Sequence, residues 1–111
     1  MFRPGTTIGE LCDAVVKINE RERPATGPAA GALAHLTMHG RGQGDDGPIV
    51  TGSARLPYQL RRELRPGMVC ILKPEVRAAD RTHPTTWGDT VVVTEDGGRR
   101  LGRREHGIWV A

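Results

Sequence analysis

The chain has 111 residues and a mass of 12.1 kDa, a size that corresponds to a single domain with one hydrophobic core. Hydrophobic residues make up 37% of it and charged residues 26%, and the mean hydropathy is −0.42. No segment approaches the roughly 20 apolar residues that a membrane-spanning helix needs, which excludes a spanning helix. Residues 1–5 do not lead into the apolar stretch of a secretion signal, so we expect a cytoplasmic protein without a membrane partner.

Basic residues outnumber acidic ones, and arginine carries the excess. The sequence has 14 Arg and 2 Lys against 13 acidic residues, for a net charge of +3. A nucleic-acid-binding domain usually gathers its basic residues in one stripe and places aromatic residues among them. Here the aromatic residues are scattered, and we interpret the densest basic cluster as a solvent-exposed hairpin edge or tail: Arg99, Arg100, Arg103 and Arg104. Nucleic acid is therefore not the expected partner.

The two cysteines, Cys12 and Cys70, lie far apart and both in apolar stretches. In a cytosolic protein such residues are usually reduced thiols in the core, and we favour this interpretation. A disulfide bond between them is the alternative.

Residues 7–20 carry the pattern of an amphipathic helix. Thr7 and Glu10 have the spacing of a capping box, in which each side chain accepts a hydrogen bond from the other residue's backbone amide. The apolar residues that follow recur at the helical period: Ile8, Leu11, Cys12, Val15 and Ile18. Pro24 disfavours helical geometry at the residue before it, and the Pro-, Gly- and Ala-rich segment 24–31 predicts a loop.

Most of the remaining chain is predicted to form strands. We expect strands near residues 32–39, 48–53, 67–73 and 89–102, the last region being a hairpin. Pro74 is predicted to end the third strand, and residues 56–64 predict a short helix. The expected fold is a single α+β domain over residues 1–111, a mainly antiparallel sheet backed by one long and one short helix.

Alternation along strand 32–39 places His35, Thr37 and His39 on one face of the sheet. Two histidines four residues apart are a zinc-binding pattern on a helix, but their separation is wider on a strand. We therefore favour a structural or orienting role for His35.

A glycine-rich segment follows His39. The string Gly40-Arg41-Gly42-Gln43-Gly44 resembles a phosphate-binding loop, but neither Lys-Ser nor Lys-Thr follows it, so nucleotide binding is not expected. Asp45 and Asp46 could bind a cation through their oxygens, although turn formation is the more common role of such a pair.

Several motifs, taken together and in order, resemble one protein family. His39-Gly40-Arg41-Gly42 is followed by the sequence LRPGMV at 64–69, then Lys73-Pro74, and then GDTVVVTEDG at 88–97; the opening RPGTTIGEL at 3–11 also matches. This order and spacing resemble the C-terminal half of the pita-bread metallopeptidases, the family of methionine aminopeptidase, aminopeptidase P, prolidase and creatinase. The resemblance implies half of a pita-bread fold, with a curved sheet.

The resemblance also implies a set of metal ligands, which this chain matches at one position. Active members bind two divalent metals through two Asp, one His and two Glu, and the metals activate a water that attacks the scissile amide. The His corresponds to His39, but the two Glu correspond to Lys73 and Gly88, and a further family His to Asp46. Both Asp ligands belong to the N-terminal half of the family domain.

From the resemblance we assign candidate site residues. His39 and Lys73 are the catalytic candidates, and His39 is the metal candidate, with Glu75 or Asp89 as substitute ligands. The candidate ligand-binding residues are His35, Gly40, Arg41, Gly42, Asp46, Glu75 and Asp89.

Two functions are consistent with this pattern. The first is a degenerate metallopeptidase-like domain without peptidase activity and without a cofactor, which binds a peptide-like or small-molecule ligand or another protein around His39. The alternative is the C-terminal part of an active hydrolase, with Mn, Co or Zn, or with metal-free chemistry as in creatinase. A homodimer, in which a second copy replaces the missing half, or a separate N-terminal half-domain is the expected partner.

Overall fold

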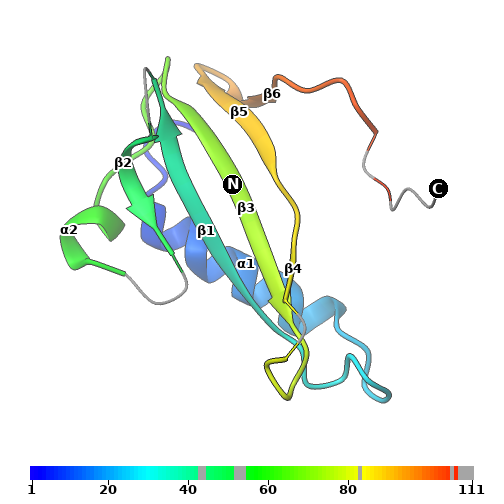
Figure 1. Ribbon diagram of the computed structural model, residues 1–111. Helices are drawn as coiled ribbons and strands as arrows, with labels where there is room; N and C mark the ends of the chain where they lie inside the picture. The colour runs from blue at the N-terminus through cyan, green and yellow to red at the C-terminus, as the bar shows by residue number, and fades with distance from the viewer. Residues whose placement is uncertain (43–44, 52–54, 83, 106, 108–111) are drawn as a thin grey trace.

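The computed structural model describes residues 1–42, 45–51, 55–82, 84–105 and 107. It consists of one sheet with two helices on the same side, as the ribbon in Figure 1 shows. The helices are α1 (Ile8–Glu22) and α2 (Pro57–Leu60), and the strands are β1 (Leu33–Arg41), β2 (Asp45–Val50), β3 (Val69–Arg77), β4 (Pro84–Thr86), β5 (Asp89–Thr94) and β6 (Gly97–Arg100). The strand order is β2-β1-β3-β5-β6, with β4 paired to β3, and every pairing is antiparallel. The predicted α+β class is confirmed.

Helix α1 begins where the sequence predicts. The Thr7 hydroxyl accepts from the Glu10 amide at 3.2 Å, and the Glu10 carboxylate accepts from the Thr7 amide at 2.7 Å, which completes the capping box. The helix ends at Glu22, with Arg23 in an extended conformation before Pro24. Neither α1 nor α2 has the length and apolar character of a transmembrane helix.

The capping box should make the stability of α1 depend on pH. The hydrogen bonds that its carboxylate accepts from the Thr7 amide, and then from the Thr7 hydroxyl, lower the pKa of Glu10. A lowered folded-state pKa gives stability that is present above the unfolded pKa and is lost as the pH falls through the folded one. We expect Glu10→Ala to be less stable than wild type at pH 7, and the difference to shrink well below pH 4.5.

Urea unfolding at several pH values measures this difference. Glu20→Ala removes an exposed carboxylate from the same helix outside the cap and is the matched control. A difference between wild type and Glu10→Ala that is constant from pH 7 to pH 3 would contradict the role given to the cap.

Strand β1 alternates between two environments. Leu36 and Met38 are buried beneath α1, whereas Thr37 and His39 lie on the opposite side of the sheet at intermediate exposure. We call this opposite side the open face, because neither α1 nor α2 covers it (Figure 1). The predicted grouping of His35, Thr37 and His39 on one face is confirmed.

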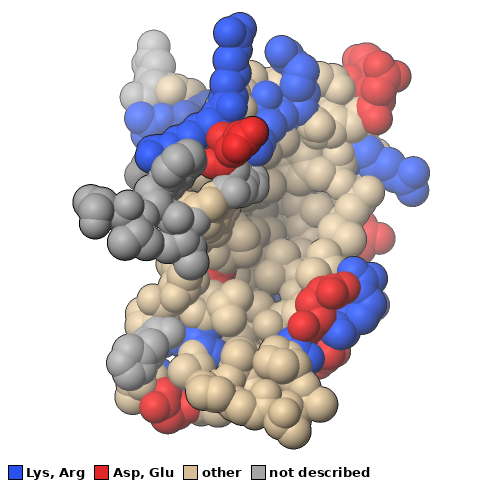
Figure 2. All heavy atoms as spheres, turned by 90° about the vertical axis from the view of Figure 1, so that its right-hand side faces the viewer, with Lys and Arg blue, Asp and Glu red and all other residues tan. Residues whose placement is uncertain are grey.

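Helix α1 covers only part of its own side of the sheet. Beside it lies a hollow of about 420 Å³, lined mostly by apolar side chains from α1, β3 and β5. Figure 2 faces the β5–β6 edge and shows a hollow with a mostly uncharged surface. Asp89 and Arg100 are the charged residues in its lining.

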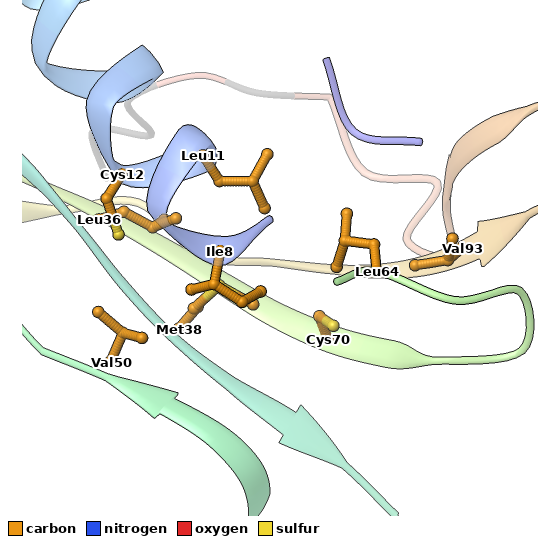
Figure 3. Close-up of a cluster of buried hydrophobic side chains, with 9 residues drawn as sticks. All are labelled: Ile8, Leu11, Cys12, Leu36, Met38, Val50, Leu64, Cys70 and Val93. Carbon is orange, nitrogen blue, oxygen red and sulfur yellow. The ribbon is translucent and has the colours of Figure 1, made fainter. Parts of the chain in front are cut away.

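The core lies between α1 and the sheet. Its nine buried members are labelled in Figure 3: Ile8, Leu11, Cys12, Leu36, Met38, Val50, Leu64, Cys70 and Val93. Both cysteines are free and buried, as predicted, and burial raises the pKa of each thiol. Of the predicted apolar helix face, Ile18 is 41% exposed and is not among the residues that pack against the core.

The prediction that Pro74 ends the third strand is wrong. β3 continues to Arg77, and Pro74 pairs with Leu36 of β1. The Pro74 carbonyl accepts from the Trp87 amide at 3.1 Å, so the missing N–H of Pro74 faces residues 87–88, between β4 and β5, rather than β1. The β1–β3 pairing therefore loses no hydrogen bond at the proline.

Other boundaries also differ from the predictions. β2 begins at Asp45 rather than near residue 48, residues 52–53 of the predicted strand lie outside the described part, and β4 was not anticipated. The predicted helix 56–64 is a single turn, α2, after which Leu64 enters the core. The segment after α2 does not need helical structure to reach the core, because the single side chain of Leu64 makes the contact.

Candidate functional site

The centre of the open face brings together three positions that are far apart in the sequence. Thr37 pairs with Lys73, and His39 pairs with Ile71, so His39 and Lys73 are diagonal neighbours on adjacent strands. Such diagonal neighbours are separated by about 7–8 Å. A Cβ atom added to Gly88 would lie 3.5 Å from Lys73 Cγ. Residues 39, 73 and 88 therefore form one site, which we call the His39 site.

A backbone contact orients the imidazole of His39. Its Nδ1 lies 2.9 Å from the Gly40 carbonyl oxygen. A carbonyl can only accept, so Nδ1 carries the proton, and in the neutral ring Nε2 carries the lone pair. A histidine held in this way has the tautomer of a metal ligand or a general base.

Lys73 places a positive charge beside this imidazole. It lies at intermediate exposure, and among the described residues it forms no ion pair with a carboxylate. At an effective dielectric near 20, two unit charges about 7–8 Å apart interact with about 2 kcal/mol. The ammonium therefore disfavours a cation in the His39 site and favours an anion.

The described residues of the His39 site do not fit a dinuclear metal centre. The described part of the chain contains no group of three or more His, Cys, Asp or Glu side chains with a geometry that could hold a metal ion. Position 73 carries the ammonium group of a lysine, and position 88 is a glycine without a side chain. The resemblance leads us to expect a carboxylate at each of these positions. Carboxylates are the anionic oxygen donors that divalent metals need.

Glu75, the first of the expected substitute ligands, pairs with His35 instead of His39. Its Oε1 lies 3.7 Å from His35 Nε2 and accepts a hydrogen bond from Arg77 Nε. Because Glu75 lies four residues from Ile71, the partner of His39, it is about 13 Å along the strand from that histidine.

Asp89, the second expected substitute, shares a face with Leu72, its pairing partner, on the helix side of the sheet. Its carboxylate forms a 2.9 Å ion pair with Arg100 and accepts from the Thr90 amide at 2.9 Å. The sheet therefore separates Asp89 from His39, because neighbouring residues of a strand point to opposite faces.

The glycine-rich segment begins at the end of β1. Gly40 is buried and pairs with Cys70, whereas Arg41 and Gly42 are exposed. A register shift between His39 and Gly40 brings Asp46 opposite Gly40 in the β1–β2 pairing. The Asp46 side chain lies outside the described part, as do Gln43 and Gly44.

Two residues of the open face were missed by sequence reasoning. Arg77 contacts Glu75, and Arg81, in the turn after β3, lines a cavity on the open face together with both of them. Lys73, Glu75 and Arg77 follow the alternation of a strand, a signal that was available in the sequence. The prediction that Pro74 ends the strand excluded Arg77 from this pattern.

Comparison with known proteins identifies the family. The sequence profile described as metallopeptidase family M24 matches residues 1–95. No curated protein matches the chain. Because the matched region covers most of the 111 residues, the chain belongs to metallopeptidase family M24.

Proposed function

We propose that this M24 domain binds a carboxylated ligand, either peptide-like or a small molecule, at the His39 site and does not hydrolyse peptides by itself. The observation that carries the proposal is that position 88 lies next to Lys73, which is the diagonal neighbour of His39. Lys73 supplies an ammonium and Gly88 has no side chain at the two positions where active members have glutamates, as the resemblance implies. An exchange of two carboxylates for one cation changes the preferred occupant from a divalent metal to an anion.

The chemistry of the site is suited to a carboxylate. Lys73 supplies three donors and a full positive charge, and the Thr37 hydroxyl lies on the same face directly opposite it. The imidazole of His39 offers a further polar group to the rest of the ligand. Gly88 leaves room next to the lysine, because its missing side chain would otherwise contact Lys73 Cγ.

The test combines a binding measurement with an assay for peptidase activity. Calorimetric titration with the acidic peptide Ac-Glu-Ala-Ala-Ala-Glu-NH₂ should show binding to wild type and at least tenfold weaker binding to Lys73→Met. Lys17→Met is the matched control, because Lys17 is the other lysine of the chain and is exposed on α1. Stoichiometric Mn, Co or Zn in the purified protein, together with cleavage of a peptide library, would contradict the proposal.

The second candidate function is the C-terminal part of an active hydrolase whose other half is supplied upstream or by another chain. The orientation of His39 supports this candidate, because Nε2 carries the lone pair of a ligand or general base. Lys73 would then stabilise an anionic intermediate. A hydrolase activity that appears with an N-terminal half-domain and is lost in His39→Ala would favour it over the first.

The expected assembly follows from the same resemblance. A second copy of the chain, or an N-terminal half-domain, would take the place of the other half of the pita-bread fold. Light scattering distinguishes a homodimer from a monomer, and a monomer at high protein concentration would contradict the homodimer.

A further inference from the structure

A cavity with charged side chains in its lining lies on the open face, toward the ends of β1 and β3 that carry Leu33 and Arg77. It has a volume of about 620 Å³ and lies beside the end of β3 and the turn that follows it. Its lining includes Leu33, His35, Thr37, Glu75, Arg77 and Arg81. We call it the Arg81 pocket.

Glu75 organises one wall of this pocket. Its side chain is only 16% exposed, and a single oxygen, Oε1, contacts both His35 Nε2 and Arg77 Nε. The carboxylate thus holds the guanidinium in place by a hydrogen bond and lies near the imidazole. Nε is the only group of the Arg77 guanidinium bonded within the described residues, so its terminal nitrogens are available to a ligand.

Arg81 supplies a charge that the described residues do not neutralise. It forms no ion pair with a described carboxylate, and the nearest in sequence, Asp80, accepts instead from the Thr82 amide and hydroxyl at 3.0 and 2.7 Å. The Arg81 backbone has a φ of 62°, and its amide donates to the Ala78 carbonyl at 2.8 Å. The turn that carries the guanidinium is therefore closed by hydrogen bonds of its own.

The charges of the pocket favour an anion. Two guanidinium groups and one carboxylate leave one uncompensated positive charge beside partly buried side chains. Guanidinium groups bind carboxylates through paired hydrogen bonds, a geometry that an ammonium does not offer.

We propose that the Arg81 pocket binds a second anionic group of the same ligand whose first carboxylate lies at Lys73. This inference rests on the proposed function and narrows the ligand class to extended molecules with two anionic groups. Lys73 and Arg77 are four residues apart on one strand, about 13 Å. An extended acidic peptide with acidic side chains four residues apart has the same spacing.

The test compares two peptides and two proteins. Wild type should bind Ac-Glu-Ala-Ala-Ala-Glu-NH₂ at least tenfold more tightly than Ac-Glu-Ala-Ala-Ala-Gln-NH₂, and Arg81→Asn should reduce this preference to less than twofold. Asparagine removes the charge and tolerates a positive φ, so the turn is retained. Arg23→Asn, a change of the same kind at an exposed residue after α1, should keep the full preference.

Each result distinguishes this inference from the proposed function. Equal binding of the two peptides by wild type, with loss of both in Lys73→Met, would refute anion binding in the Arg81 pocket. It would leave the proposed carboxylate binding at the His39 site intact. A preference for the peptide with two glutamates that persists in Arg81→Asn would also refute anion binding in the Arg81 pocket. Failure of wild type to bind either peptide would contradict both proposals.

Discussion

The double variant Lys73→Glu with Gly88→Glu is expected to bind Zn²⁺ at His39 with a Kd of about 1 µM or lower. A Kd of 1 µM corresponds to a binding free energy of about −8 kcal/mol. His39 and the two new carboxylates would supply three donors on one face, the number found in catalytic zinc sites. Position 88 accepts a Cβ atom without a clash, because that atom would lie 3.5 Å from Lys73 Cγ, an ordinary contact distance. Calorimetry with Zn²⁺ and elemental analysis after dialysis measure the gain relative to wild type.

Removal of the histidine is the control for this gain. Adding His39→Ala to the double variant should weaken zinc binding at least 100-fold, because only two carboxylates remain. Zinc affinity that is unchanged by His39→Ala, or no gain in the double variant, would show that positions 39, 73 and 88 do not share a site. The proposed function would then lose its main support.

The variant Ile8→Ala is expected to lower the free energy of unfolding by about 2–5 kcal/mol, because it leaves a cavity in the core. Ile8 is fully buried at the start of α1, where it packs among the side chains shown in Figure 3. A domain of this size has about 5–15 kcal/mol of stability in total, so the loss is a large fraction of it. Urea unfolding followed by circular dichroism measures the change.

Ile18→Ala is the matched control for this variant. It makes the same chemical change on the same helix, but Ile18 is 41% exposed. We expect a loss below about 1 kcal/mol, since surface substitutions usually change stability little. Equal losses in the two variants would contradict the position of α1 on the sheet.

Local features of the sequence were sufficient to predict the elements whose cause is local. The capping box at Thr7 and Glu10 predicted the start of α1, because both partners of its hydrogen bonds lie within one turn. Alternation along residues 32–39 predicted that His35, Thr37 and His39 share one face of β1, because side chains of a strand alternate regardless of its neighbours. The motifs around His39, Lys73 and Gly88 likewise indicated the family that the profile comparison identified.

The sequence alone thus determined the α+β class, the long helix and the face of the sheet that carries His39. The tertiary structure decided what depends on neighbouring strands. Pro74 is tolerated inside β3 because its missing N–H faces the interval between β4 and β5. Strand pairing also sets Glu75 beside His35 and turns Asp89 to the helix side, since register fixes which residues from distant segments meet. No local pattern contains that information, because it arises only when the strands align.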